Sequence, residues 1–460
     1  MAISLDYTNC LAEAIGATHG LTKSEVETLV AKFPKHHEGV EEIRASGECP
    51  FFDLPYQNTG EVQALIKKHR GAWSDLLIIA TGGEAEALRA LHGALSHAAH
   101  NLVEPKARRE APRLHLLDNL DPRTVAQASE ALDPKKTLIQ VVSRDGRATE
   151  VLGLTAWAVD WLRRKGGKTA AQLVICTDRD KSPLAELARS DKCDLIHHPQ
   201  HLPGRFAVLS ASALFAAGLL GCDIAALLAG AAEMDKRCRH GDALKNPAYM
   251  HALVHYLLTR KRRKTMHAAY AFSDRLHAIA AWYVHLCTVS LGKMLNRKGK
   301  AVHVGPTPLA ARGSYDLSVQ QQLYAEGPYD KVVTFLIARQ HGPSLQVPAV
   351  RLEGFPWLKE QSFEAILERS WIACEQQLTA SGRPSMAIQL DAIDEHHIGG
   401  LVYMLELSTV MSAELYDINP FDAPGAEQAM QGVWAQSGAA GHEDLARRIR
   451  EYRGRARRSC

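Results

Sequence analysis

The chain has 460 residues, a length that favours two or three folded domains. Hydrophobic residues make up 46% of it and charged residues 23%, which is typical of a globular protein and excludes a fibrous or disordered one. Its 54 basic and 51 acidic side chains give a formal net charge of +3, so overall charge provides no argument for nucleic-acid or membrane binding.

Cysteine spacing and hydropathy narrow the class further. The nine cysteines stand singly, without the paired spacing of a zinc or redox motif, and we expect no metal and no cofactor. The first residues, MAISLDYTNCLAEAIG, lack the basic and apolar regions of a secretory signal. No segment reaches the roughly 20 uninterrupted apolar residues of a membrane span. These patterns predict a cytoplasmic protein with no membrane partner.

The N-terminal third begins with helices and continues as an α/β unit. Residues 8–45 predict two helices, with Thr22 as the N-cap before Glu25. Short apolar runs then alternate with amphipathic helices, which predicts a parallel sheet covered on both faces. The predicted strands lie at 76–81, 114–118, 137–143 and 172–177, and helices start at Glu84, near Thr124 and at Thr149.

A helical stretch at 210–236 and 247–258 leads into a second unit of the same kind. Its predicted strands lie at 264–270, 301–305, 332–337 and 386–390, with helices at 273–295, 319–325 and 396–415 and a terminal helix ending in a basic tail. The expected fold class is α/β, with two doubly wound parallel-sheet domains of three αβα layers. The expected segments are an N-terminal helical segment (1–60), a first domain (61–240), a second domain (241–410) and a C-terminal arm (411–460).

Two loops at predicted strand ends are candidate ligand sites, because helix N-termini there offer unpaired N–H groups. In the first, Gly82 and Gly83 precede Glu84 and allow close approach of the backbone. The second follows the strand at 137–143 and can cradle an oxyanion; its candidate residues are Ser143, Arg144, Asp145, Gly146, Arg147, Thr149 and Glu150. A tight turn and a helix cap with solvated charges are the alternative interpretations.

Two further segments carry polar groups toward the expected cleft. Arg205, in LPGRFAVLS, is placed to project as a fixed cation. The other segment combines the helix at 282–293 with the loop at 304–324.

The chain resembles the bacterial glucose-6-phosphate isomerase family along nearly its whole length. The resemblance is carried by LLDNLDPRTV (116–125), GRFAVLS (204–210), LLAGAAEMD (227–235), KNPAYM (245–250), SDRLHAIAAWYVHL (273–286), SLGK (290–293), VGPTP (304–308), QLYAEGPYDKVVTF (322–335) and ELYDINPFDAPGAE (414–427). It implies two sugar-isomerase-type domains, a C-terminal arm, a homodimer, and a sugar-phosphate cleft between the domains that the dimer shares.

The same resemblance implies that most of the catalytic side chains are replaced. The family's glutamate base, ring-opening histidine and catalytic lysine fall on Val289, Ser318 and Met430, and only Arg205 is retained. In the phosphate loop Ser143 is kept while Arg144, Asp145, Arg147 and Ala148 are substituted, and Glu84 stands where the family has serine.

Aldose–ketose isomerisation needs a group that abstracts a carbon-bound proton, and valine has none. The sequence therefore predicts a family member impaired in catalysis or repurposed to bind a sugar phosphate or another small anion.

Two alternatives stay open. One is an active isomerase of glucose 6-phosphate or a related sugar that uses a replacement group such as His285, one turn before Val289, or Asp316. The other is an interaction module. The tail is dense in arginine (Arg447, Arg448, Arg450, Arg453, Arg455, Arg457 and Arg458) and is suited to an acidic partner, although a solvated or frayed terminal helix is the simpler explanation.

Overall fold

The computed structural model describes residues 3–178, 181–350, 354–455 and 458. The chain up to Pro420 forms one compact unit, and the chain from Phe421 onward forms a second one. The finer division into four segments remains a prediction. Arg457 of the basic tail lies outside the described residues.

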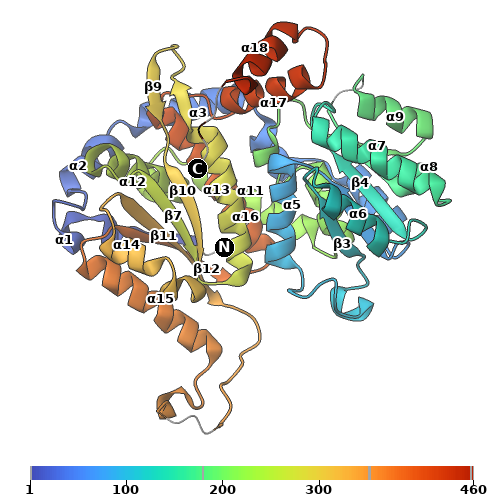
Figure 1. Cartoon of the computed structure of the whole chain (residues 1–460). Coiled ribbons are helices and arrows are strands. Elements are labelled where there is room, and N and C mark those ends of the chain that lie inside the picture. The colour runs from blue at the N-terminus through green and yellow to red at the C-terminus, as the bar shows by residue number, and fades with distance from the viewer. Residues whose placement is uncertain (1–2, 179–180, 351–353, 456–457, 459–460) are drawn as a thin grey trace. The chain divides into compact units, whose positions relative to one another are not determined.

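The first sheet of the larger unit has five parallel strands in the order β3-β2-β4-β5-β6. The strands are β2 (Asp75–Ile79), β3 (Arg113–Leu117), β4 (Thr137–Val142), β5 (Leu173–Thr177) and β6 (Asp194–His197). The helices of this part are α5 (Gly82–Leu95), α6 (Pro122–Ala131), α7 (Thr149–Arg164), α8 (Thr169–Gln172) and α9 (Pro183–Asp191). β2, β4 and β5 are buried throughout, as expected for strands covered on both faces. The doubly wound α/β prediction is confirmed (Figure 1).

The second sheet has the order β1-β12-β11-β7-β10 and is parallel except for its edge strand β1. Its strands are β1 (Ile3–Asp6), β7 (Met266–Ala271), β10 (Thr307–Arg312), β11 (Lys331–Gln340) and β12 (Ser385–Ala392). Its helices are α13 (Asp274–Leu291), α14 (Gln321–Glu326), α15 (Phe363–Ala380) and α16 (Glu395–Tyr416). From β7 onward the strand order repeats that of the first sheet, with the unit's first strand between its second and third.

One predicted strand has a different role. The run at 301–305 does form a strand, β9 (Ala301–Val304), but it pairs antiparallel with β8 (Lys293–Leu295) in a separate hairpin. β8 occupies the end of the helix predicted at 273–295, which stops at Leu291. In the second sheet, the edge strand that pairs with β7 is β10 and not the run at 301–305. Its Pro308 is compatible with an edge, where a missing N–H donor is tolerated.

The remaining helices of this unit frame the two sheets. They are α1 (Ala12–Ile15), α2 (Lys23–Val30), α3 (Phe33–Ser46), α4 (Gly60–His69), α10 (Ala211–Leu219), α11 (Ile224–Cys238) and α12 (Pro247–Arg262). The predicted cap of α2 is confirmed, because Thr22 and Glu25 form a reciprocal capping box. One predicted helix start shifts, because α5 begins at Gly82 and not at Glu84. Helix α7 begins at Thr149 as predicted, with Ala148 as its N-cap residue.

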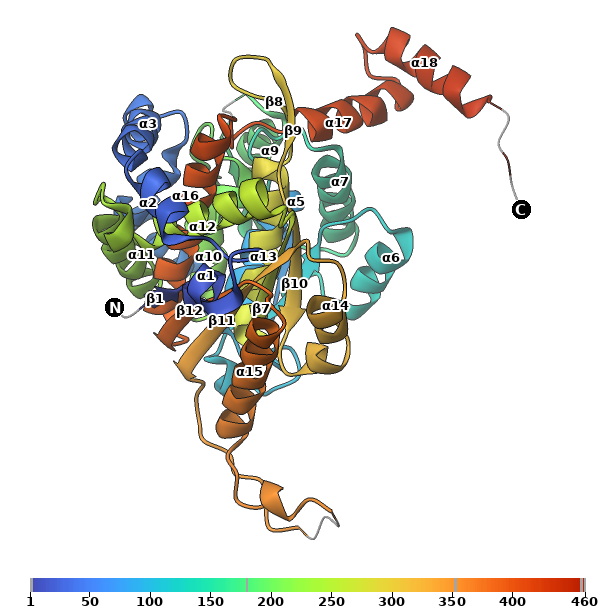
Figure 2. The same cartoon turned by 90° about the vertical axis from the view of Figure 1, so that its left-hand side faces the viewer.

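Helices α5 and α13 join the two halves of the larger unit. They cross so closely that a Cβ atom on Gly93 would lie 2.5 Å from the Cβ of Ala278. Nearby, Arg275 Nε donates to the carbonyl oxygen of Ala94 at 2.6 Å. Figures 1 and 2 show α13 beside the second sheet and α5 beside the first. These contacts fix the first turns of α13 against the end of α5.

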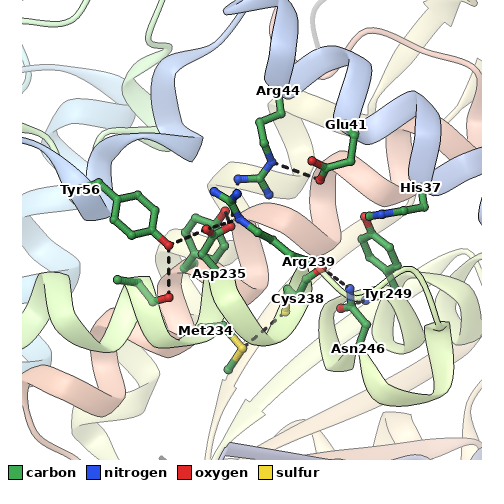
Figure 3. Close-up of polar contacts among 12 residues, drawn as sticks. His37, Glu41, Arg44, Tyr56, Met234, Asp235, Cys238, Arg239, Asn246 and Tyr249 are labelled. Carbon is green, nitrogen blue, oxygen red and sulfur yellow. Dashed lines mark hydrogen bonds and ion pairs between the residues drawn. The ribbon is translucent and has the colours of Figure 1, made fainter.

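A buried ionic cluster around Asp235, drawn in Figure 3, ties α3 to α11 and α16. Asp235 is fully buried, and Arg44 Nη1 and Arg239 Nε each lie 2.9 Å from one of its carboxylate oxygens. Tyr56 donates to the same carboxylate at 2.7 Å, and Tyr403 donates to it as well. Burial alone raises the pKa of Asp235, but the tyrosine hydrogen bonds and the charge of Arg44 lower it overall.

Helix α16 has the length and hydropathy of a membrane span, but 94% of its apolar window is buried inside the protein. At its middle stands Glu406, fully buried, and neither of its carboxylate oxygens has a hydrogen-bond partner among the described residues. Burial raises the pKa of Glu406 well above its ordinary value, so the folded state binds the proton more tightly than the unfolded one. Its contribution to stability is therefore present at acid pH and is lost as pH rises above about 4.3.

We expect Glu406→Gln to raise the free energy of unfolding at pH 8 by about 1–3 kcal/mol, because it removes a buried ionisable group. The gain should vanish near pH 4, where Glu406 is protonated in both states. Urea unfolding of both proteins between pH 4 and pH 8 measures it. Glu42→Gln, at an exposed position of α3, is the control and should leave the free energy of unfolding unchanged at both pH values. A pH-independent difference would contradict the assignment.

The smaller unit contains α17 (Pro424–Gln436) and α18 (Glu443–Arg453). The terminal helix predicted from sequence is thus two helices. The described tail arginines are mostly exposed; Arg447 pairs with Asp444 at 2.7 Å, and Arg455 lies over the ring of Tyr452.

Candidate functional site

The candidate site lies at the switch point of the first sheet, between β2 and β4, where ligands of doubly wound sheets bind. Gly82 begins α5 with a φ of +56°, a conformation that glycine adopts at little cost. Gly83 is buried, and a Cβ atom there would collide with the backbone of Gly204 and Arg205. Glycine at position 83 therefore lets α5 touch the segment that carries Arg205.

Glu84 connects the two predicted ligand segments. Its carboxylate lies against Gly204, so closely that a Cβ atom on this glycine would overlap it. Burial raises the pKa of Glu84 and the charge of Asp145 adds to this effect, while the charges of Arg144 and Arg205 oppose it. Glu84, at the family's serine position, thus brings a carboxyl group close to both the loop at 143–150 and Arg205.

The loop at 143–150 is tightly built against the end of β5. Ser143 is buried, and its N–H donates to the carbonyl of Cys176 at 3.0 Å. Gly146 has a φ of +63°, and a Cβ atom there would lie 2.6 Å from the Cβ of Ser182. The Asp145 carboxylate accepts from the Arg147 N–H at 3.1 Å. That amide is therefore already used within the loop.

A cavity of about 260 Å³ lies beside this loop. It is lined by Arg144, Asp145, Asp178, Gln200 and His201. Among the described residues that line it, one cationic side chain faces two carboxylates, and this lining is less suited to a phosphate dianion than an all-cationic one.

Arg205 is the centre of the site. It is 7% exposed and belongs to the short 3₁₀ segment η5 (Gly204–Phe206). Its Nε donates to Ser290 Oγ at 2.8 Å, its Nη2 donates to the Pro420 carbonyl at 2.6 Å, and its own carbonyl accepts from Trp282 Nε1 at 3.1 Å. These contacts fix the guanidinium as an oriented cation.

Three of the contacting groups were not predicted as site residues. Ser290, Pro420 and Trp282 belong to SLGK, ELYDINPFDAPGAE and SDRLHAIAAWYVHL, which carried the family resemblance. Their membership of these motifs was the signal in the sequence that could have identified the three residues. The tertiary structure brings all three motifs to one arginine.

Val289 is the residue next to Ser290 on α13, so the predicted base position lies beside a residue that holds Arg205. Its backbone carbonyl accepts from Lys293 Nζ at 2.8 Å, and its side chain is hydrocarbon. His285 lies one turn earlier on the same helix. Burial, together with the charge of Arg205, lowers the pKa of His285, which favours a neutral imidazole at pH 7.

The two other replaced positions belong to elements other than α13. Ser318 is exposed, and its hydroxyl donates to the Tyr315 carbonyl within its own turn at 3.1 Å. Within residues 3–178, 181–350, 354–455 and 458, no hydrogen bond joins Ser318 to Arg205. Met430 is 37% exposed on α17 in the smaller unit. Asp316 is buried, and its carboxylate accepts from the Arg312 N–H at 2.6 Å.

Across the described part of the chain, no group of three or more His, Cys, Asp or Glu side chains is arranged to hold a metal ion.

Comparisons with known proteins identify the family of the chain. The Phosphoglucose isomerase family matches residues 66–324. Glucose-6-phosphate isomerase of Carboxydothermus hydrogenoformans is 31% identical over 455 residues, covering 96% of each chain. That of Rubrobacter xylanophilus is 33% identical and covers 80% of this chain and 84% of its own.

Two solved structures share the fold. A hypothetical protein from Thermus thermophilus superposes with a TM-score of 0.80 at 27% identity, covering 96% of this chain and 100% of that one. A glucose-6-phosphate isomerase from Chlamydia trachomatis superposes with a TM-score of 0.73 at 19% identity, covering 86% of this chain and 76% of that one.

The two doubly wound sheets, shared with these solved structures, place the chain in the sugar-isomerase fold class of α/β proteins. Within that class, the chain belongs to the phosphoglucose isomerase family.

Proposed function

We propose that this protein keeps the sugar-phosphate cleft of its family but is impaired in the family reaction, the conversion of glucose 6-phosphate to fructose 6-phosphate, and serves as a binding or regulatory protein for a sugar phosphate or other small anion. The observation that carries the proposal is Val289, a hydrocarbon side chain next to the residue that holds Arg205. We further propose a cytoplasmic homodimer, as the resemblance implies.

The chemistry explains why this one position matters. Isomerisation moves a proton between neighbouring carbons, and a positioned general base contributes about 10²- to 10⁴-fold to such a step. Val289 offers no proton acceptor, while Arg205 can still stabilise negative charge. The protein is thus equipped to bind an anionic sugar better than to turn it over.

The direct test is a dehydrogenase-coupled assay of the purified protein with glucose 6-phosphate. We expect turnover at least about 10²-fold below the usual enzyme range of 1–10³ s⁻¹. Calorimetry should detect binding of glucose 6-phosphate, and Arg205→Lys should weaken it by about tenfold or more, because lysine cannot reproduce the two directed hydrogen bonds. Turnover within the ordinary range would overturn the proposal.

His285 supports a second candidate, an active isomerase with a replacement base. It lies close enough to Arg205 for that charge to lower its pKa, and a neutral imidazole can accept a proton. If this candidate is correct, His285→Gln abolishes turnover and leaves binding of glucose 6-phosphate unchanged. If the protein is instead impaired, His285→Gln changes neither measurement.

The exposed tail arginines support binding to an acidic partner as a separate proposal. We expect affinity for a single-stranded polynucleotide to fall about 50-fold between about 50 and 200 mM salt if roughly four phosphates are neutralised. Filter binding at several salt concentrations measures the slope, with the chain truncated after Leu445 as control. Salt-insensitive binding, or binding that survives truncation, would reject a role for the tail.

A further inference from the structure

The guanidinium of Arg205 donates to two segments that are far apart in the chain. Ser290, near the end of α13, accepts from Nε, and Pro420, after the end of α16, accepts from Nη2. Arginine presents its donors in one rigid plane, so both acceptors must keep their places for the guanidinium to keep its direction. Ser290 belongs to a long helix, whereas Pro420 belongs to a segment without helix or strand. The orientation of Arg205 therefore depends on what fixes this segment.

The β8–β9 hairpin contacts the start of the segment. β8 follows α13 almost directly, so the hairpin continues from the helix that carries Ser290. At its turn, Asn296 Nδ2 donates to Asp417 Oδ2 at 2.9 Å, and the Arg297 N–H donates to the Asp417 carbonyl at 2.8 Å. The Arg297 guanidinium also pairs with Glu414 in the last turn of α16. One element thus links the end of α13 to the end of α16.

The turn of the hairpin is ordered around Asn296. The side-chain oxygen of Asn296 accepts from the N–H groups of Lys298 and Lys300 at 3.1 Å and 2.9 Å. Its backbone N–H donates to the Lys300 carbonyl at 2.9 Å. Because the oxygen faces these donors, the amide nitrogen is the atom left to donate to Asp417. The turn therefore presents this donor in a fixed direction.

Asp417 is the residue at which the chain leaves α16. Its φ of +57° is left-handed, a conformation that glycine, asparagine and aspartate adopt more readily than other residues. The next residue, Ile418, is fully buried in an apolar cluster with Leu291 of α13, and Val302 of β9 packs against that cluster. The segment before Pro420 is thus held by polar and apolar contacts with the same two elements.

Charge strengthens the connection at the end of α16. Burial alone raises the pKa of Glu414, but its contacts with His36 and Arg297 lower it overall, so the carboxylate is ionised at pH 7. A hydrogen bond between two charged groups is stronger than one between neutral groups. Arg297 therefore anchors the hairpin next to Asp417.

We propose that Asn296 and Asp417 are positioning residues for Arg205. Their contact keeps the Pro420 carbonyl in place on the guanidinium, while the helix that leads into the same hairpin carries Ser290. Neither residue is proposed to touch the ligand. This inference rests on the function proposed above, because it assumes that the oriented guanidinium binds the anionic sugar.

Two variants of Asp417 test the proposal on the full chain. Asp417→Asn and Asp417→Gly both remove the charge and both suit the left-handed backbone, but only asparagine keeps an oxygen that accepts from Asn296. In calorimetry, Asp417→Gly should weaken binding of glucose 6-phosphate about 3- to 10-fold, the equivalent of one hydrogen bond. Asp417→Asn should retain binding. Lys298→Ala, at an exposed position of the same turn, is the matched control and should leave binding unchanged.

The Arg205→Lys background separates positioning from a general structural effect. If Asp417 acts through the guanidinium, Asp417→Gly weakens binding in the unaltered protein and has no further effect in Arg205→Lys. The proposal is wrong if Asp417→Gly binds as tightly as the unaltered protein, or if it loses as much affinity in Arg205→Lys. Equal losses in Asp417→Gly and Asp417→Asn would also contradict it.

A measurement without ligand keeps this inference distinguishable from the proposed function. In protein with isotope-labelled arginine, NMR follows the exchange of the Arg205 Nε–H proton with water, and loss of the signal in Arg205→Lys identifies it. We expect Asp417→Gly to accelerate this exchange about 3- to 10-fold and Asp417→Asn to leave it unchanged. Faster exchange in a protein that does not bind glucose 6-phosphate would support positioning and reject the proposed function. Unchanged exchange in Asp417→Gly would reject positioning, whether or not the sugar binds.

Discussion

Val289→Glu should raise the turnover of glucose 6-phosphate by about 10²- to 10⁴-fold over the unaltered protein, the contribution of one positioned general base. The new carboxylate would stand beside Ser290, whose hydroxyl holds Arg205 Nε at 2.8 Å. The retained arginine is then available to stabilise the charge that develops on the substrate. The coupled dehydrogenase assay measures the gain.

Thr288→Glu is the matched control for this variant. Thr288 is the preceding residue of α13 and is exposed, so its side chain points about 100° away around the helix. It adds the same charge to the same helix without placing a base beside Arg205. Equal gains in the two variants would mean that charge alone raises the rate. No gain with Val289→Glu, in a folded protein that binds glucose 6-phosphate, would show that the cleft is altered beyond this one group.

Much of the scaffold was predictable because buried parallel strands have a strong sequence signal. β2, β4 and β5 are continuous apolar runs, and each lies within two residues of its predicted limits. Two edge strands of the second sheet, β1 and β10, lack this signal. β1 is short, and β10 (TPLAAR) contains a proline and no long apolar run, so neither was predicted. The run at 301–305 has alternating exposure, which suits the hairpin it forms.

The site was predictable only where a residue type carries its own chemistry. Arg205 and Val289 could be singled out, because a cation within a family motif and a missing carboxylate are visible in the residue letters. The partners of Arg205 could not be, since the Ser290 hydroxyl and the Pro420 carbonyl are common groups that matter only through tertiary position. Glu84 was predicted as a ligand-site residue of the Gly82–Gly83 segment, and only the packing against Gly204 showed that it contacts the segment of Arg205.

The largest stability effect is expected from Asp235. Asp235→Ala should lower the free energy of unfolding by about 3–5 kcal/mol, the range for breaking a buried ion pair by removing one partner. The main cause is the buried charge that the variant leaves behind, and the lost attraction matters less. Arg44 is largely buried and would keep its charge without this carboxylate. Tyr403, which is fully buried, would also lose the acceptor for its hydroxyl.

Urea unfolding followed by circular dichroism measures this loss, with Asp160→Ala as the control. Asp160 pairs with Arg164 at 2.9 Å on the surface of α7, where both side chains are more than half exposed, and such pairs contribute about 0–1 kcal/mol. The double variant Arg44→Met/Asp235→Leu separates the two explanations. Because it removes both charges together, it should recover much of the stability lost in Asp235→Ala. A double variant as unstable as the single one would mean that the cluster stabilises the fold through its attraction, and that the arginine left without Asp235 contributes little.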